Sequence, residues 1–280
     1  MTPMAIRSVF AITAIEAEPA VRDSLRRFTS DLVGIDQTRR SPNHGARVGP
    51  VDWPDSIVLH YTGMHDGPSA VDWLCNPASE VSCHYVVDEA GTILQLVSEH
   101  RRAWHAGRSS WAGVTDMNSA SIGIEIVNGG HDFDLPAFPD VQIGAVINLC
   151  RDIMRRHAVR PERVLAHSDI APSRKRDPGE RFPWRDLAAV GVGQWAEPTI
   201  EPKGETLIPG MRGEAVMELQ EALARYGYGI PATGSYDSHT QIVVRAFQRH
   251  FRPTMVDGIA DPGTHQLLAT LNAALSGSIR

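Results

Sequence analysis

Short runs of apolar and β-branched residues recur through the first two thirds of the chain. They have the length of strands, and glycine, proline and asparagine bound them. In two of the runs a polar side chain, His60 in one and Glu125 in the other, stands where a buried strand would otherwise be apolar. The predicted strands are 56–62, 83–87, 92–97, 121–127 and 163–167. The second and third form a β-hairpin around a turn that contains Gly91.

Amphipathic helical patterns lie between these strands. The longest begins at Pro139–Asp140 and ends near His157 in a basic cluster, which suits the carboxyl end of a helix. Shorter helices are predicted at 68–74 and 182–190. The first of them has closely spaced apolar positions at Ala70, Val71, Trp73 and Leu74.

The sequence changes in character after a proline-containing linker at 196–206. Three amphipathic helices follow, and the last two begin with the same signature, Gly-x-x-Asp-x-x-Thr, at 234–240 and 258–264. Each copy combines a turn glycine with an aspartate at the N-cap. This small duplication predicts a compact helical domain that can fold alone.

Residues 1–40 are predicted to be an extension. A helical pattern follows Glu18, and Gly34 would end it. The apolar run after Arg7 resembles a secretory leader only weakly, because it is short and acidic residues follow at once. An ordinary helical or disordered extension is the favoured interpretation, and a signal peptide is the alternative.

Composition and charge narrow the classes of partner. The chain has 280 residues, 42% of them hydrophobic, and a net charge of −6, as in a globular protein. The negative charge argues against general affinity for nucleic acid, which needs a basic surface. No apolar run approaches the roughly 20 residues of a membrane span. The cysteines, Cys75, Cys83 and Cys150, are odd in number and show no zinc-knuckle or redox spacing.

A candidate metal site comes from His60 and His167, which end two predicted strands, and from Asp177 in a basic turn. Two imidazoles and a carboxylate suit Zn²⁺ and leave a fourth position for water, whose pKa zinc lowers towards ~7. Glu125 is the candidate general base, because a carboxylate in an apolar strand is costly unless it is paired or functional. Lys175, beside the aspartate, could stabilise an oxyanion.

Each of these residues also has an ordinary structural explanation. Histidines at strand ends are often hydrogen-bonded structural residues, Asp-Pro-Gly is usually a turn, and a basic run is usually solvated. Glu125 could pair with an arginine. The chain has 12 histidines, so chance placements are expected. Spacing alone therefore leaves zinc hydrolysis as one hypothesis among several.

Six ordered motifs carry a resemblance to a known family. They are 59–62 (LHYT), 82–85 (SCHY), 103–107 (AWHAG), 121–125 (SIGIE), 166–169 (AHSD) and 174–179 (RKRDPG). Together they closely resemble the zinc N-acetylmuramoyl-L-alanine amidases, which share their fold with phage amidase-type lysozymes and peptidoglycan recognition proteins. The resemblance covers about 41–195. It implies an α/β (α+β) fold, with a mixed central sheet flanked by helices and a zinc site in a surface groove.

The resemblance also implies roles for individual residues. His60, His167 and Asp177 match the family's zinc ligands. Glu125 matches its catalytic glutamate, and Lys175 its catalytic lysine. Relatives that only recognise peptidoglycan typically lack a zinc ligand, whereas this sequence lacks none, so the resemblance favours an enzyme.

Four further residues lie in or near these motifs without matching a ligand. Trp104 and His105 are expected to line the substrate groove, where an aromatic face could pack on a sugar or on the peptide. His84 and Asn128 are further candidates for substrate contacts. Structural roles for all four are equally open.

The last part of the chain resembles the peptidoglycan-binding domain of cell-wall hydrolases. The likeness rests on a leucine–glycine pattern at 207–213 and on the pairs 219–220, 227–228, 247–248 and 257–258. The predicted organisation is then an extension at 1–40, an amidase domain at 41–195, a linker at 196–206 and an all-α three-helix domain at 207–280.

The expected function is zinc-dependent hydrolysis of the amide between N-acetylmuramic acid and L-alanine in peptidoglycan or muropeptides, with one Zn²⁺ per catalytic domain. A peptidoglycan-recognition protein without turnover and a zinc peptidase that cleaves within the stem peptide are the alternatives. We expect a monomer whose only partner is this substrate. A wall-binding domain favours the periplasm or cell envelope, whereas the weak leader and the unpaired cysteine leave the cytoplasm as the alternative.

Overall fold

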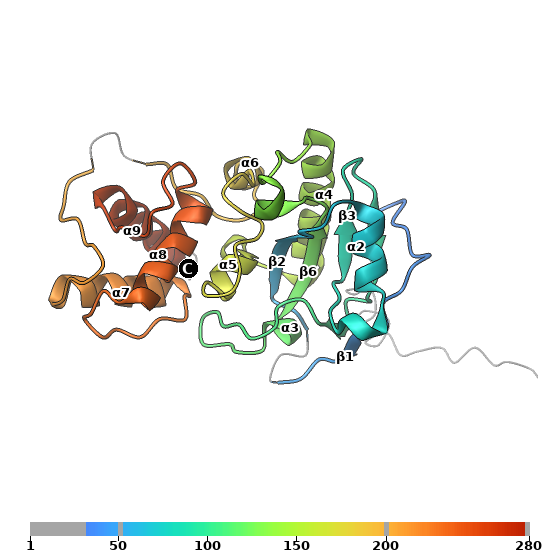
Figure 1. Ribbon diagram of the computed structural model, residues 1–280, viewed down its shortest axis with the longest axis horizontal. Coiled ribbons are helices and arrows are strands. Elements are labelled where there is room, and N and C mark those ends of the chain that lie inside the picture. Colours follow the sequence, from blue (N-terminus) through green and yellow to red (C-terminus); the bar gives the residue numbers. More distant parts are fainter. Residues whose placement is uncertain (1–31, 50–52, 199–201, 278–280) are drawn as a thin grey trace, which may run out of the picture.

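The computed structural model describes residues 32–49, 53–198 and 202–277. A sheet with its covering helices forms one part of the molecule, and the helices near the carboxyl end form a second part beside it (Figure 1). The helix predicted after Glu18 and the weak leader fall within 1–31 and lie outside the described residues. Among the described helices, none combines the length and the apolarity that crossing a membrane requires.

The central sheet has five strands in the order β4-β3-β6-β2-β7. These are β2 (Ser56–Tyr61), β3 (Tyr85–Val87), β4 (Ile93–Gln95), β6 (Ser121–Ile126) and β7 (Val164–Ala166). All pairs are parallel except β3 with β4, which is the predicted hairpin. The predicted mixed sheet is therefore confirmed.

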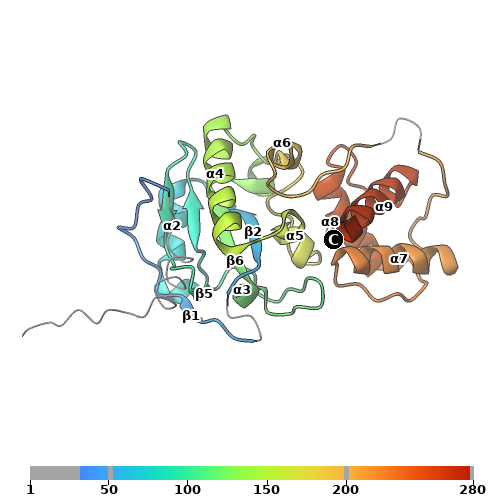
Figure 2. The ribbon, with the colours of Figure 1, turned by 180° about the vertical axis from the view of Figure 1, so that it is seen from behind.

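The two faces of the sheet carry different side chains, because successive residues of a strand point to opposite sides. Ile57 and Ile122 belong to the core that β2 and β6 form with α4 (Asp140–His157) and α6 (Trp184–Ala189); α4 crosses this face in Figure 2. Successive side chains point to opposite faces. His60 and Glu125 therefore lie on the other face, which α2 (Gly67–Leu74) covers.

Shorter elements complete this part of the molecule. They are α3 (Met117–Ala120), α5 (His167–Ile170) and the strands β1 (His44–Ala46) and β5 (Arg101–Ala103), with the 3₁₀ turns Pro77–Ser79, Gly130–Phe133 and Pro161–Arg163. β1 pairs with β5, so part of the predicted loop at 41–54 is a strand.

One prediction about the last strand is wrong. β7 stops at Ala166, and His167 is the first residue of α5 rather than the end of a strand. The Asp169 carboxylate accepts a hydrogen bond of 2.8 Å from the Ala166 backbone N–H, which closes the first turn of the helix. This hydrogen bond from the backbone of Ala166 to Asp169 accounts for the change from strand to helix at His167.

The second part consists of α7 (Glu214–Tyr226), α8 (Ser238–Phe251) and α9 (Pro262–Gly277). The duplicated signature works as predicted: Asp237 accepts a hydrogen bond from the Thr240 N–H at 2.8 Å, and Asp261 accepts one from Thr264 at 2.9 Å. Each aspartate thus satisfies a backbone donor that the start of its helix leaves unpaired.

A second repeated device supports the duplication. The side-chain oxygen of Gln220 accepts a hydrogen bond from the Gly234 N–H, and that of Gln248 accepts one from the Gly258 N–H. Both glutamines are buried. Each ties a helix to the turn glycine that precedes the next helix, which accounts for the glutamine in both repeats.

The two parts share one apolar core. Trp111, Leu165 and Ile170 from the first part lie in the same buried cluster as Tyr228 and Phe247 from the second. The helical part therefore rests against α5 and its neighbouring loop, as both views show (Figures 1 and 2). The residue boundaries of the domains stay a prediction.

Candidate metal and catalytic site

Three side chains that lie far apart in the sequence meet at one point. His60 Nδ1 is 2.9 Å from His167 Nδ1 and 3.0 Å from Asp177 Oδ2, and the latter two atoms are 2.9 Å apart. All three residues are buried, and together they form a group that could hold a metal ion. Three donor atoms this close can each reach one cation at the bond lengths of about 2 Å that zinc prefers.

The outer nitrogens of both imidazoles are turned away from this point. His167 Nε2 lies 3.2 Å from the Ala106 carbonyl, to which it can only donate, so Nδ1 carries the free lone pair. His60 Nε2 lies 3.0 Å from His105 Nδ1. Arg174 also donates to the Ala106 carbonyl and thereby holds that loop in place. Metal-ligating histidines typically have partners of this kind on their second nitrogen.

The charges suit a divalent cation. Burial, followed by the neighbouring His167, lowers the pKa of His60 to about 4, so this imidazole is neutral near pH 7. Burial alone would raise the pKa of Asp177, but His167 and His60 outweigh it and hold that pKa well below its usual range. Two imidazoles, of which that of His60 is neutral, and one carboxylate match the donor set that zinc takes.

Glu125 lies directly opposite His60 on the neighbouring strand. Its Oε2 atom is buried, and no hydrogen-bond partner for it exists among the described residues. Burial and then the Asp177 carboxylate raise the pKa of Glu125 well above its usual range. A cation between the ligands would act in the opposite direction. The Oε2 atom of this buried carboxylate thus has no partner of the kind that a purely structural role would supply.

A cavity of about 310 Å³ opens beside these groups. Glu125, His167, Lys175 and Asp177 line it, together with residues from α2 and from the loops after β2 and β5. The structure therefore brings the predicted base, the predicted cation and two predicted ligands to one hollow. Lys175 is half-buried there, whereas its neighbour Arg176 is exposed.

The walls of this cavity contain residues that the sequence interpretation missed. Tyr61 and Trp73 line it, and Trp73 is 50% exposed rather than part of the core. The buried face of α2 consists of Gly67, Ala70, Val71 and Leu74. Trp73 is off this face, so the spacing of the other four residues could have shown that it points outward.

The four tentative substrate residues are placed differently from one another. Trp104 and His105 line the cavity. His84 is fully buried behind them, and its Nδ1 accepts a hydrogen bond from the Gly123 N–H. Asn128 is buried with both ends of its amide bonded to backbone, since it donates to Pro136 and accepts from Gly130.

His105 has a structural partner on each ring nitrogen. Its Nδ1 faces His60 at 3.0 Å, and its Nε2 faces Ser121 Oγ at 3.4 Å. Ser121 in turn donates to the Met117 carbonyl. A Cβ atom on Gly123 would approach the His105 ring to 2.4 Å, which explains the glycine in this strand. His105 thus lies behind a candidate ligand as well as at the cavity wall.

Comparison with known proteins identifies the family of this chain. A family model for N-acetylmuramoyl-L-alanine amidases matches residues 50–180, and a model for a putative peptidoglycan binding domain matches 212–268. The N-acetylmuramoyl-L-alanine amidase AmiD of Escherichia coli (strain K12) is 38% identical over 77% of this chain and 81% of that protein. A putative N-acetylmuramoyl-L-alanine amidase of Rickettsia conorii is 31% identical over 71% of this chain and 75% of that protein.

Two solved structures are similar over most of the chain. One is AmiD from E. coli in complex with its substrate anhydro-N-acetylmuramic acid-L-Ala-D-gamma-Glu-L-Lys, at 37% identity and a TM-score of 0.68, covering 81% of this chain and 93% of that one. The other is AMPDH3 from Pseudomonas aeruginosa, at 33% identity and a TM-score of 0.66, covering 88% and 100%. The chain therefore belongs to the N-acetylmuramoyl-L-alanine amidase family, and it is a hydrolase of the bond between N-acetylmuramic acid and L-alanine.

Proposed function

We propose that this amidase is a zinc enzyme whose ion is held by His60, His167 and Asp177. The observation that carries the proposal is the triangle of donor atoms 2.9–3.0 Å apart, in which the second nitrogen of each imidazole is bonded elsewhere. When bound there, zinc would polarise the scissile carbonyl and lower the pKa of a coordinated water.

Glu125 is the residue we assign to proton transfer. It lies opposite His60 and lines the same cavity as His167 and Asp177, so that its carboxylate can receive the proton of the attacking water. The same group, once protonated, can return the proton to the departing amine of L-alanine. Its apolar surroundings favour the neutral form, and this makes the second step easier.

Lys175 is assigned to the oxyanion that forms as water attacks the lactyl carbonyl. It lines the cavity together with Glu125 and Asp177, and a fixed positive charge at this edge stabilises the negative charge that develops in the transition state. Its backbone N–H bonds to the Ala171 carbonyl, which anchors the loop that carries it.

Muropeptides with a peptide stem are the proposed substrates. One relative binds an anhydromuramic tripeptide and another an anhydromuramic pentapeptide. Trp73 and Trp104 wall the cavity here, where they can cover a stem or a sugar. We further propose that the domain containing 212–268 binds peptidoglycan and raises the local concentration of substrate. The cell envelope is the compartment that this domain favours.

The test is digestion of purified muropeptides with product identification by mass spectrometry. Release of the intact stem peptide is expected, and Glu125→Gln should lower kcat roughly 10²–10⁴-fold while zinc remains bound. Glu89→Gln changes an exposed carboxylate and serves as the control. Shortened stems would favour the zinc peptidase instead. A zinc-loaded protein with no turnover would favour the recognition protein.

A further inference from the structure

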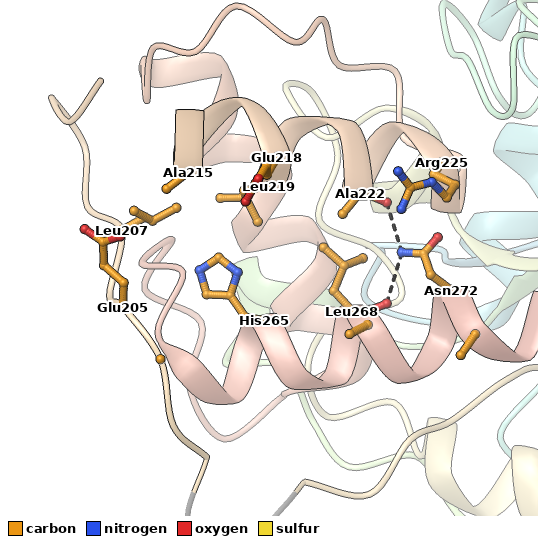
Figure 3. A pocket seen from close by; sticks show the side chains of 13 residues that line it. Glu205, Leu207, Ala215, Glu218, Leu219, Ala222, Arg225, His265, Leu268 and Asn272 are labelled. Carbon is orange, nitrogen blue, oxygen red and sulfur yellow. Dashed lines mark hydrogen bonds between the residues drawn. The ribbon is translucent and has the colours of Figure 1, made fainter. Parts of the chain in front are cut away.

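A second cavity lies in the helical domain, far along the chain from the catalytic groups. It measures about 630 Å³ and opens between α7, α9 and the segment before α7 (Figure 3). Asn272 of α9 donates hydrogen bonds to the Ala222 carbonyl of α7 and to the Leu268 carbonyl. The bond to Ala222 joins α9 to α7 at this cavity, and the bond to Leu268 lies within α9 and fixes the Asn272 side chain.

The lining combines an apolar floor with charges at opposite ends. Leu207, Leu219 and Leu268 form the floor. Glu218 lies towards one end and Arg225 lies at the other (Figure 3). They are two helical turns apart on α7, about 10 Å along its axis. Glu205 adds a second carboxylate at the acidic end.

These charges are available to a ligand. No salt bridge within the described part of the chain engages Glu205, Glu218 or Arg225. His265 lies between the two ends in Figure 3, and burial lowers its pKa. It is therefore neutral near pH 7 and can accept or donate one hydrogen bond.

The kind of lining argues for a peptide rather than a glycan. None of the described residues around the cavity is a phenylalanine, tyrosine or tryptophan, the faces on which sugar rings usually stack. An extended peptide spans about 10 Å with three residues. A stem such as L-Ala-D-γ-Glu-L-Lys, the one in the substrate of AmiD, carries an apolar methyl, a free carboxylate and an ammonium over that length.

We propose that this cavity binds the peptide stem of peptidoglycan, with the ammonium at Glu218 and Glu205 and a carboxylate at Arg225. This rests on the proposed wall-binding role of the domain and names the part of the polymer that the domain recognises. Because the cavity is separate from the catalytic groups, it holds a stem other than the one being cleaved.

A charge swap within the cavity tests the proposal. Glu218→Arg combined with Arg225→Glu keeps the net charge but exchanges the two ends of the site. Both side chains are exposed, so the fold should tolerate the change. The matched control is Glu221→Arg with Arg212→Glu, two exposed residues outside the cavity. All proteins are full-length and carry Glu125→Gln to prevent digestion during binding.

Binding is measured by sedimentation with purified peptidoglycan sacculi. The cavity swap should weaken the apparent Kd roughly tenfold, as expected for reversed charge complementarity at a binding site, and the control swap should leave it unchanged. Free L-Ala-D-γ-Glu-L-Lys should compete with sacculi, and glycan strands stripped of peptide should not. Equal binding by both swaps, or competition by bare glycan, would overturn the proposal.

A second variant tests the cavity independently, in case the charge-swapped protein does not fold. Ala269→Trp places a large side chain over the cavity from an exposed position on α9 and should weaken binding in the same way. In the active background, all these variants should cleave small soluble muropeptides at the wild-type rate. Failure of the proposed wall-binding role would appear as no sedimentation of the Glu125→Gln parent with sacculi. Failure of this proposal would appear as sedimentation of the parent that the cavity swap does not weaken.

Discussion

The Tyr228 hydroxyl in the helical domain donates a hydrogen bond of 2.8 Å to Asp169 Oδ1. Asp169 lies two residues beyond His167 in α5 and is buried. Its other oxygen accepts from the Ala166 N–H and lies 2.7 Å from His250 Nδ1. The His250 ring stacks on Trp184 with centroids 3.7 Å apart. The helical domain thus contacts the short helix that carries a proposed zinc ligand.

Removing the Tyr228 hydroxyl should destabilise the whole chain. Tyr228→Phe leaves one oxygen of a buried carboxylate without its donor, so we expect the free energy of unfolding to fall by about 1–3 kcal/mol. Urea denaturation followed by circular dichroism measures this. Tyr226→Phe is the control, because its hydroxyl donates only to the neutral Gln194 side chain, and it should have the smaller effect. If both variants lost the same free energy of unfolding, the hydrogen bond to Asp169 would contribute no more stability than the one to Gln194.

His105 should tune zinc affinity through His60. If His60 uses Nδ1 for the ion, its Nε2–H donates to His105 Nδ1, and His105 then donates to Ser121. His105→Ala removes the group that orients the ligand, and zinc affinity should fall roughly 10–100-fold. Competition with a chromophoric chelator gives this number without any turnover.

The matched control for this variant is His65→Ala, since His65 is an exposed histidine outside the cavity. Gly123→Ala should reproduce part of the loss, because its methyl group would push the His105 ring away. If both His105→Ala and Gly123→Ala bound zinc with wild-type affinity, His105 would not be the residue that orients His60.

Lys175 should matter for kcat more than for binding. Lys175→Met keeps most of the side-chain volume but removes the charge, and loss of one oxyanion donor typically lowers kcat by about 10²–10³-fold. Steady-state kinetics on a soluble muropeptide measure the change. Arg176→Met removes an exposed charge one residue away and should have little effect. If both variants lower kcat alike, the effect is general electrostatics rather than a contact with the oxyanion.

The lowered pKa of the buried Glu99 should make the free energy of unfolding depend on pH. Burial alone would raise its pKa, but hydrogen bonds from Arg156 and His157 outweigh burial and lower the pKa from 4.5 to about 2. A carboxyl with a depressed folded-state pKa contributes stability above its unfolded pKa and loses it as pH falls through the folded pKa. The chain should therefore lose about 3 kcal/mol from this group between pH 4.5 and 2.

Urea unfolding of the metal-free protein at several pH values tests this dependence. Glu99→Gln should be less stable at neutral pH, since it removes one of the two carboxylates that pair with the buried Arg156. Below pH 4.5 its free energy of unfolding should also fall less steeply with decreasing pH than that of the wild type. Glu89→Gln, an exposed control, should keep the wild-type slope. If the free energy of unfolding of Glu99→Gln fell with pH as steeply as that of the wild type, Glu99 would not be the source of this pH dependence.

Local patterns in the sequence were sufficient for much of the fold. The apolar runs at 56–62 and 121–127 became β2 and β6, because a buried parallel strand needs apolar residues on both faces. The polar exceptions in these runs, His60 and Glu125, stood out for the same reason. The repeated Gly-x-x-Asp-x-x-Thr predicted two capped helices, because an N-cap acts within a single turn of backbone.

Relationships between distant segments were decided only by the tertiary structure. The contact of His105 with His60 and the contact of Tyr228 with Asp169 do not follow from spacing. Each depends on how separate elements pack, and packing joins residues that are tens of positions apart. By itself the sequence determined which residue types could form a zinc site and where most of the strands and helices lie. The tertiary structure decided which side chains orient that site, because hydrogen-bond partners are chosen by distance in space.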